Sequence, residues 1–508
     1  MAHLTILPIL LPLLAAIVLL LVPTRRIAVH RFVGLLSCTG LVAVAATLAL
    51  QADDGGTRVY LVGNWAAEMG ITLAADRLSA IMLLATSLLA LPCLWFATGG
   101  WDRRALHFHV LFQFQLMGLN GAFLTADLFN LFVFFEVLLI ASYGLLLSGA
   151  RGARVRSGLH YVAFNITAST LYLFAVGYIY GITGALNMAE VAVRVAAMPA
   201  AEAAPLKAAA GLLLVVFCAK AALLPMYFWL PETYARSPAA VAALFAVMTK
   251  LGVYAVLRVF TLVFGAEAGE LANLAWPWLL PLGAATLVLA TLGALAAPSI
   301  RLLAAYLVLG SAATLFIALG LASAEALGAG LYYLLHSTLV GGAMFLLADL
   351  IRRNRDNAGD SLRKLDHMKH RTLLGLMFFV AAVSVAGLPP LSGFVGKFSL
   401  LAAVPDAQAG WIWPVILGTS LMVLVALASA ASQLFWREGG EPAPPGAIPR
   451  LRKSEVGATL ALLAMGVLLS VFGGPVLRYT QDAGAQLVAP AAYIDAVRGA
   501  LPKPGVEP

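Results

Sequence analysis

Long runs of apolar residues alternate with short polar breaks along almost the whole chain. Each run is close to the roughly 20 residues that an α-helix needs to cross the apolar core of a bilayer. Taken between breaks, the pattern predicts about fourteen membrane-spanning helices in an all-α polytopic membrane protein. The expected limits are 4–22, 31–50, 76–98, 106–125, 128–148, 158–181, 207–229, 238–261, 272–296, 301–321, 327–350, 372–403, 411–436 and 455–476.

Composition and charge agree with a membrane protein and give it an orientation. Of the 508 residues, 62% are hydrophobic and only 11% are charged, whereas charged residues make up about a quarter of a soluble protein. The net charge is +8, but the basic residues gather in alternate loops, which is the positive-inside pattern and not the patch of a nucleic-acid-binding protein. Because the number of spans is even, both termini are expected on the outer side.

The segments outside the spans carry little chemistry. Alternating side chains from Arg58 to Val62, within the polar stretch 51–70, predict a small outer β-hairpin. Residues 438–448 are rich in proline and predict an inner linker. The tail after Arg478 is expected to lie along the outer surface. The first span has neither a basic leader nor a clear cleavage site, so we expect it to stay as a helix.

A few ionisable side chains lie deep inside the apolar runs. Each costs roughly 2.5–3.5 kcal/mol at the centre of a membrane helix, so each is expected to face the protein interior, a partner or water. Arg258 and Asp349 lie near span ends, where a side chain can reach the membrane surface, and we interpret them as structural. The functional candidates are Glu136, Lys220, Lys250, His336 and Lys397.

Two of these lysines lie beside expected helix breaks. Pro225 and Pro231 follow Lys220, and each removes a backbone donor and bends or ends a helix. The pair Pro389-Pro390 precedes Lys397 in the next half of the chain. Broken helices occur at membrane depth where the backbone lines a cavity or is buried in protein. A buried lysine near a break, once in each half, is typical of transporters built from repeats.

These residues predict a row of groups that exchange protons. The alternative for Glu136 is a neutral carboxyl that only packs helices together, and the alternative for His336 is an interior histidine with its hydrogen bonds satisfied. A further alternative is that all the buried charges only pair helices in a scaffold. Tyr143, Ser311 and Ser337 are candidates to hold bridging waters.

No cofactor or metal is expected from the sequence. It contains no phosphate-binding P-loop, no dinucleotide glycine fingerprint after a strand, and no haem or iron–sulfur ligand set. Cys38, Cys93 and Cys218 lie in or beside apolar spans without the spacing of metal ligands. Any driving force is therefore expected from an ion gradient or from a partner.

Several motifs resemble those of one family. They are the stretch from Gln115 to Asn130 with Phe134 to Val137, Lys220 to Pro225, Pro231 to Pro238, Gly387 to Pro390, and Gly396 to Phe398. They are similar to the antiporter-like membrane subunits of multisubunit Na+/H+ antiporters and of respiratory NADH dehydrogenase. The likeness covers nearly the whole chain. Within the family, the chain looks most like the D subunits of the Mrp-type Na+/H+ antiporters.

The resemblance implies a fourteen-helix fold with two inverted five-helix repeats, in which the seventh and twelfth helices are broken. The corresponding regions are 1–104 with helices 1–3, 105–262 with the first repeat, 263–436 with the second repeat, and 437–508 with a linker, the last helix and an outer tail. The family's fifth-helix glutamate matches Glu136, its eighth-helix lysine Lys250 and its eleventh-helix histidine His336. The second repeat shows no equivalent glutamate, so Lys397 lacks an obvious partner within it.

The function that the resemblance implies is secondary transport, not enzymatic catalysis. The chain would be the proton-translocating subunit of a Na+/H+ antiporter in the bacterial inner membrane, with Na+ and H+ as transported ions and other subunits as partners. The alternative is a pumping subunit of an NADH dehydrogenase or a membrane-bound hydrogenase, in which the same residues would be driven by electron transfer elsewhere.

Overall fold

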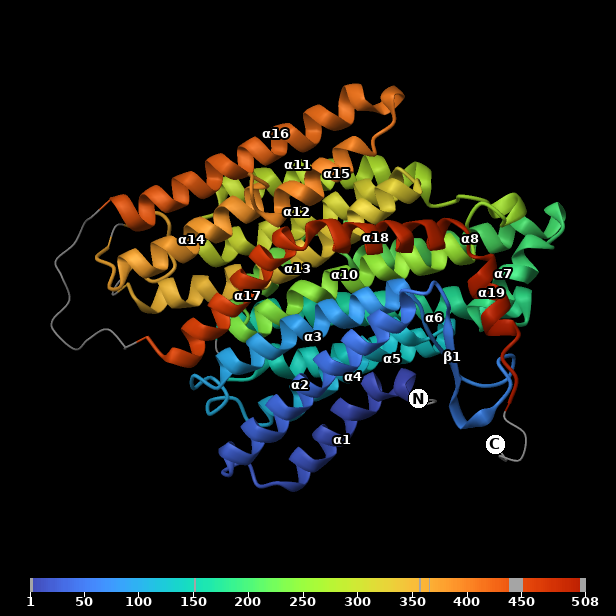
Figure 1. Ribbon diagram of the computed structural model, residues 1–508, viewed down its shortest axis with the longest axis horizontal. Helices are drawn as coiled ribbons and strands as arrows, with labels where there is room; N and C mark the ends of the chain where they lie inside the picture. The colour runs from blue at the N-terminus through green and yellow to red at the C-terminus, as the bar shows by residue number, and fades with distance from the viewer. Residues whose placement is uncertain (1–2, 150–151, 356–357, 365, 438–450, 503–508) are drawn as a thin grey trace.

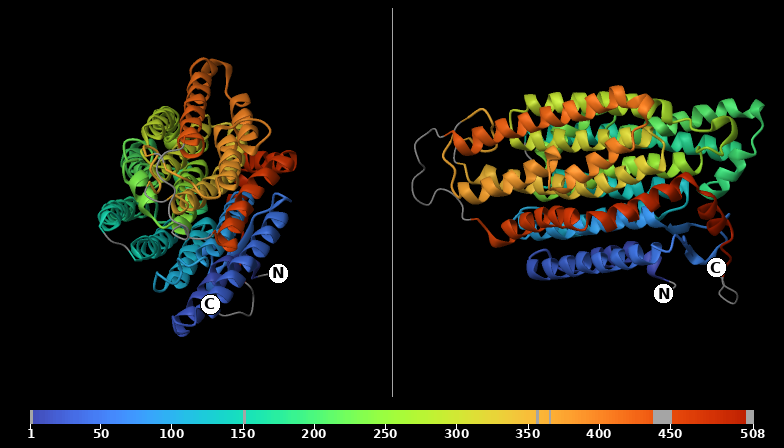
Figure 2. Two further views of the ribbon diagram at one scale, coloured as in Figure 1. Left: turned by 90° about the vertical axis from the view of Figure 1, so that its left-hand side faces the viewer. Right: turned by 45° about the horizontal axis from the view of Figure 1, so that its top comes forward.

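The computed structural model describes residues 3–149, 152–355, 358–364, 366–437 and 451–502. The expected inner linker, 438–448, lies outside the described residues. Most helices run side by side along one direction (Figure 1). Seen from the end of the bundle, the N-terminal helices and α16 lie at opposite edges of an elongated cross-section (Figure 2).

The described chain forms α-helices and one small sheet. The strands are β1 (Arg58–Leu61) and β2 (Thr72–Ala75), which pair antiparallel. The helices are α1 (Leu7–Leu21), α2 (Ile27–Ala52), α3 (Arg77–Ala97), α4 (Phe108–Leu124), α5 (Leu128–Leu147), α6 (Ala153–Thr183), α7 (Met188–Ala196), α8 (Ala203–Lys220), α9 (Trp229–Arg236), α10 (Ala239–Leu262), α11 (Trp276–Ala296), α12 (Ile300–Gly320), α13 (Ala324–Arg353), α14 (Arg371–Ala386), α15 (Ser392–Ala402), α16 (Asp406–Ala431), α17 (Lys453–Val471), α18 (Gly473–Val488) and α19 (Ala491–Arg498).

Within the described residues, twelve helical segments are long and apolar enough to cross a membrane. This makes the protein an all-α polytopic membrane protein, as the hydrophobic pattern predicted. Two expected spans are not among the twelve. Span 106–125 corresponds to α4, which has 17 residues, and span 372–403 corresponds to the two shorter helices α14 and α15.

Two helices are interrupted where the sequence places prolines. α8 ends at Lys220 and α9 begins at Trp229, so Pro225 lies between them. α14 ends with Gly387 as its cap, at a φ of 79° that glycine adopts without strain. The Pro389-Pro390 pair then precedes α15. Pro231 differs from the expectation, because it lies in the first turn of α9, where the missing N–H has no helical partner to lose.

The segments at one end of the bundle differ in part from the prediction. β1 coincides with the expected strand, but its partner β2 lies beyond the expected stretch 51–70. The tail after Arg478 does not lie on the surface throughout. α18 packs along α13, burying Thr480 and Gly484. Both ends of the described chain, the sheet and α19 lie at the same end of the bundle (Figure 1).

The centre of the protein is formed by α10 and α13, which pack against each other. Almost every side chain of α10 is buried, and so are most side chains of α13. Large apolar side chains are exposed instead on peripheral helices such as α6 and α16, as expected where lipid replaces water. This arrangement carries the polar residues of α10 and α13 into the protein interior.

Candidate functional site

Glu136, on α5, and Lys220, at the end of α8, are joined through a serine. The hydroxyl of Ser169, on α6, donates a hydrogen bond to Oε1 of Glu136. The ammonium of Lys220 donates to the same hydroxyl oxygen, with Nζ and Oγ 3.4 Å apart. Nζ also lies 4.8 Å from the centre of the Phe135 ring, close enough for a cation–π contact. The carboxylate and the lysine are thus bridged by one hydroxyl.

The break after Lys220 is held in place by neighbouring helices. The backbone N–H of Leu224 donates to Thr286 Oγ1 of α11 at 2.9 Å, and the Trp229 indole donates to the Ala219 carbonyl at 3.0 Å. Gly252 of α10 lets the break approach, because a Cβ there would lie 2.6 Å from the backbone nitrogen of Ala221. These contacts satisfy the backbone groups that the interruption frees.

Lys250 lies at the centre of α10 and is 0% exposed. Its Nζ donates to Ser311 Oγ of α12 at 2.6 Å. The Ser311 hydroxyl in turn donates to the Val308 carbonyl at 2.6 Å. A buried ammonium is costly unless it is hydrogen-bonded, so Ser311 is an important partner for this lysine.

His336 of α13 is positioned by the first residue of α15. Its Nδ1 lies 2.8 Å from Ser392 Oγ, and that hydroxyl lies 2.9 Å from the Gly466 carbonyl of α17. A serine hydroxyl has one hydrogen, and a carbonyl can only accept. The Ser392 hydrogen therefore points to Gly466, which assigns a hydrogen to Nδ1 and leaves Nε2 of His336 free to accept a proton.

Lys397 of α15 points back to the helix on the other side of the break. Its Nζ donates to the carbonyls of Val385 at 3.3 Å and Ala386 at 3.0 Å, and to Ser420 Oγ of α16 at 3.0 Å. The last carbonyls of a helix have no partner within it and carry its negative dipole end. The end of α14 therefore stabilises the positive charge that lacked an obvious partner in the sequence.

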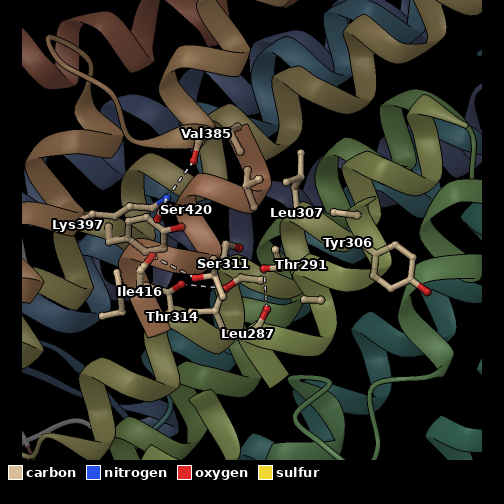
Figure 3. A pocket seen from close by; sticks show the side chains of 16 residues that line it. Leu287, Thr291, Tyr306, Leu307, Ser311, Thr314, Val385, Lys397, Ile416 and Ser420 are labelled. Atoms are coloured by element: carbon tan, nitrogen blue, oxygen red, sulfur yellow. Dashed lines mark hydrogen bonds between the residues drawn. The ribbon is translucent and has the colours of Figure 1, made fainter. Parts of the chain in front are cut away.

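Lys397 lines a cavity between α11, α12 and α16 (Figure 3). We call it the Lys397 cavity; it offers about 40 Å³ to the centres of water molecules. Ser311, Thr314, Thr419 and Ser420 give it a polar wall, and Tyr306 lies at the side away from Lys397 (Figure 3). A second cavity of about 20 Å³ is lined by His336, Ser337 and again Ser311, and we call it the His336 cavity.

The two ionisable residues interpreted as structural are both paired. The sequence suggested that Arg258 extends to the membrane surface, whereas in the structure its side chain is paired inside the protein. It is buried and donates to both carboxylate oxygens of Asp76, before α3, at 2.7 and 2.6 Å. Burial favours a higher pKa for Asp76, but the nearby guanidinium outweighs it and lowers the pKa. Asp349 forms ion pairs with Arg352 and Arg353 at the end of α13.

The structure therefore brings the five candidates into two groups. Glu136 and Lys220 share Ser169, while Lys250, His336 and Lys397 are arranged around Ser311 and the two cavities. Of these partners, the sequence indicated only Ser311, as a candidate to hold a bridging water; Ser169, Ser392, Ser420 and the α14 carbonyls were not identified from it. Across 3–149, 152–355, 358–364, 366–437 and 451–502, no group of three or more His, Cys, Asp or Glu residues is suited to a metal ion.

A family model described as NADH:quinone oxidoreductase/Mrp antiporter, transmembrane, matches residues 125–424. This stretch is more than half of the chain and contains all five candidate residues. The chain belongs to this family. The resemblance of its motifs to antiporter-like subunits is thereby confirmed.

Individual members of the family are similar over nearly the whole chain. The D subunit of a probable K+/H+ antiporter of Rhizobium meliloti is 39% identical, with 98% of each chain covered. The D subunit of the Na+/H+ antiporter of Alkalihalophilus pseudofirmus is 35% identical over 98% of this chain and 99% of its own. A chain in the structure of the Mrp complex from a Dietzia species is 29% identical, with a TM-score of 0.86, covering 98% of this chain and 100% of the other.

Proposed function

We propose that this chain is the proton-translocating membrane subunit of a multisubunit monovalent cation/proton antiporter. The observation that carries the proposal is a set of five proton-binding groups, each hydrogen-bonded to a serine hydroxyl. Lys220, Lys250 and His336 are buried, and Glu136 and Lys397 are half-buried. The bonds are the Glu136–Ser169–Lys220 chain, Lys250 with Ser311, His336 with Ser392, and Lys397 with Ser420. Buried charges at membrane depth are costly, which favours a transport role for them.

The proposed path begins at Glu136. A carboxylate that takes up a proton loses its charge, and the nearby Lys220 then loses a stabilising partner. Lys220 is thereby favoured to pass a proton toward Lys250. The change in charge at Lys250 then favours proton transfer to His336 and Lys397. Because each lysine is held by neutral hydroxyls or carbonyls, its neutral form keeps a hydrogen-bonding environment as well.

The finer architecture belongs to the same proposal. The twelve apolar segments, together with α4 and the α14–α15 pair, support about fourteen spans. The breaks at α8–α9 and α14–α15 support two repeats, 105–262 and 263–436, between an N-terminal region (1–104) and a C-terminal region (437–508). In a bacterial inner membrane, the positive-inside rule puts both termini outside.

The names of the relatives bear on the ion and on the driving force. They name antiporters of K+/H+ and of Na+/H+, and we propose Na+ as the exchanged cation, with K+ as the competing ion in the assay. Other subunits of the same complex are the proposed partners. The redox-driven alternative is less well supported, because the relatives at 35–39% identity are named as antiporter subunits.

The test is cation-induced proton movement in inverted membrane vesicles that contain the complete complex. Glu136→Ala and Lys220→Ala are each expected to lower the rate by about 100-fold or more, the scale of a lost proton-transfer group. Lys364→Ala removes an exposed loop lysine and is the matched control, with the normal rate. Co-purification of the other subunits checks assembly.

Normal transport by both buried-site variants would contradict the proposed function. Flavin or iron–sulfur proteins in the purified complex would support the redox-driven alternative instead. Replacing Na+ by K+ in the same assay identifies the cation that the assembled complex exchanges.

A further inference from the structure

Ser311 occupies a position that the proposed path does not by itself explain. Its hydroxyl is bonded to Lys250, and its side chain lines both the Lys397 cavity and the His336 cavity. Lys250 itself lines neither of these cavities. Tyr333 also lines both cavities. Among the described residues, however, Ser311 is the one that lines both cavities and accepts a hydrogen bond from Lys250.

The two cavities lead to different proton acceptors. One has Lys397 and Ser420 on its wall, and the other has His336 and Ser337. A water molecule needs about 10–15 Å³ on this measure and several polar partners. The Lys397 cavity, at about 40 Å³, has room for a few waters, and the His336 cavity, at about 20 Å³, has room for one.

We propose that Ser311 is a branch point of the proton path. From it, a proton that leaves Lys250 reaches Lys397 either by way of His336 or directly through the Lys397 cavity. This inference rests on the proposed function, and it makes the Ser311 hydroxyl a proton relay between Lys250 and two cavities with room for water.

The transfer needs one water molecule in the cavity as the proton acceptor, and no other reactant. The Ser311 hydroxyl rotates away from the Val308 carbonyl and gives its hydrogen to a water in one cavity. As that O–H bond breaks, the N–H bond of the Lys250 ammonium breaks and its hydrogen forms a new O–H bond on Ser311. Lys250 ends neutral, Ser311 ends with one hydrogen, and the water carries the charge onward to His336 Nε2 or toward Lys397.

With two routes in parallel, removing His336 and removing the Ser311 hydroxyl have different effects on transport. Removing His336 leaves the Lys397 cavity with Ser311, Thr314 and Ser420 still in place, so transport continues more slowly. Removing the Ser311 hydroxyl disconnects Lys250 from both cavities at once. His336 is therefore dispensable for transport, whereas the hydroxyl at position 311 is not.

The experiment compares Ser311→Ala, Ser311→Thr and His336→Ala in vesicles containing the complete complex. Ser311→Ala is expected to slow cation-induced proton movement by about tenfold or more, which corresponds to the loss of one charge-assisted hydrogen bond. Ser311→Thr keeps a hydroxyl and is expected to recover most of the rate. His336→Ala is expected to lose about two- to threefold, since one of two routes remains.

Ser87→Ala is the matched control. Ser87 of α3 is buried and its hydroxyl donates to Leu84 of its own helix, as a buried serine on a proton path could do, but it lines neither cavity. The rate of this variant is expected to stay within about twofold of that of the unmodified complex, because the change lies outside both proposed routes. Co-purified subunits show in each case that the complex is assembled.

The outcomes separate the branch from the proposed function. If Glu136→Ala and Lys220→Ala abolish transport while Ser311→Ala is normal, the function stands and the branch point is wrong. If His336→Ala abolishes transport as completely as Ser311→Ala, there is a single route through His336. If Ser311→Thr fails to recover the rate in an assembled complex, the hydroxyl is not what matters at position 311.

Discussion

The two halves of the membrane region each hold a lysine beside a helix break, buried at Lys220 and half-buried at Lys397, but they stabilise its charge differently. Lys220 shares the Ser169 hydroxyl with a carboxylate, Glu136. Lys397 is held by Ser420 and by two peptide carbonyls at the end of α14. A carboxylate can itself bind a proton, whereas a carbonyl is a fixed dipole at any physiological pH.

This difference assigns different properties to the two lysines. The surroundings of Lys220 change when Glu136 takes up a proton, so the first half can respond to a proton that arrives. The partners of Lys397 stay the same throughout, so its charge depends on what reaches it through the Lys397 cavity. A buried lysine thus needs no acidic residue nearby, provided that a helix end supplies carbonyls.

The largest effect is expected from removing both members of the first pair. Glu136→Ala combined with Lys220→Ala should leave cation-induced proton movement about 100-fold or more below normal, because two proton-binding groups are lost. The scaffold interpretation expects the opposite, since a pair that only balances charge can be neutralised together without loss. Full transport by the double variant would therefore show that Glu136 and Lys220 only balance each other's charge, and that the first half does not respond to protons as proposed.

The next largest difference in transport rate is expected between variants of Ser169 and Ser420, the serines bonded to the two lysines. Ser169→Ala removes the hydroxyl that bridges Glu136 and Lys220, and is expected to slow transport about tenfold, as for one charge-assisted hydrogen bond. Ser420→Ala leaves Lys397 with both α14 carbonyls and is expected to cost only about threefold. Equal rates for the two variants would show that the carbonyls do not substitute for a hydroxyl.

The smallest effect is expected from the glycines that shape the breaks. A Cβ at Gly387 would lie 2.7 Å from Cδ of Lys397, and one at Gly252 would lie 2.6 Å from the backbone nitrogen of Ala221. Alanine at either position is expected to lower stability by about 1–3 kcal/mol through crowding. Thermal unfolding of the purified complex measures this, with Gly418→Ala, which meets open space, as the control.

Transport by the glycine variants also shows which of the two helix breaks is more sensitive to a small displacement. Gly387→Ala displaces Lys397 from its carbonyls, while Gly252→Ala moves the break away from α10 without touching the Glu136–Ser169 bond. A loss of transport that is larger at Gly387 would show that Lys397 depends on the position of a backbone segment. A larger loss of transport at Gly252 would show that transport depends more on the position of the break after Lys220.

Much of the fold was predictable from the sequence because the membrane imposes simple rules. Spans had to be apolar and about 20 residues long, so most of the long helices lie close to the apolar runs, whereas the short helices α7 and α9 were not predicted. The packing of α18 on α13 was not predicted either, because α18 carries Arg478, Gln481 and Asp482 among small residues. The ion pair of Arg258 with Asp76 was not predicted, because the two residues lie far apart in sequence.

The sequence by itself determined that five ionisable groups must lie away from lipid, because burying a charge in hydrocarbon is costly wherever the chain leads. It also indicated where two helices are interrupted, at Pro225 and at Pro389-Pro390, because proline lacks a backbone donor. Only the tertiary structure decided what each buried group touches. Serines and carbonyls occur throughout the chain, so the sequence could indicate Ser311 only as a candidate to hold a bridging water, and it did not indicate Ser169 or the end of α14. All three became partners of the lysines only when packing brought their helices together.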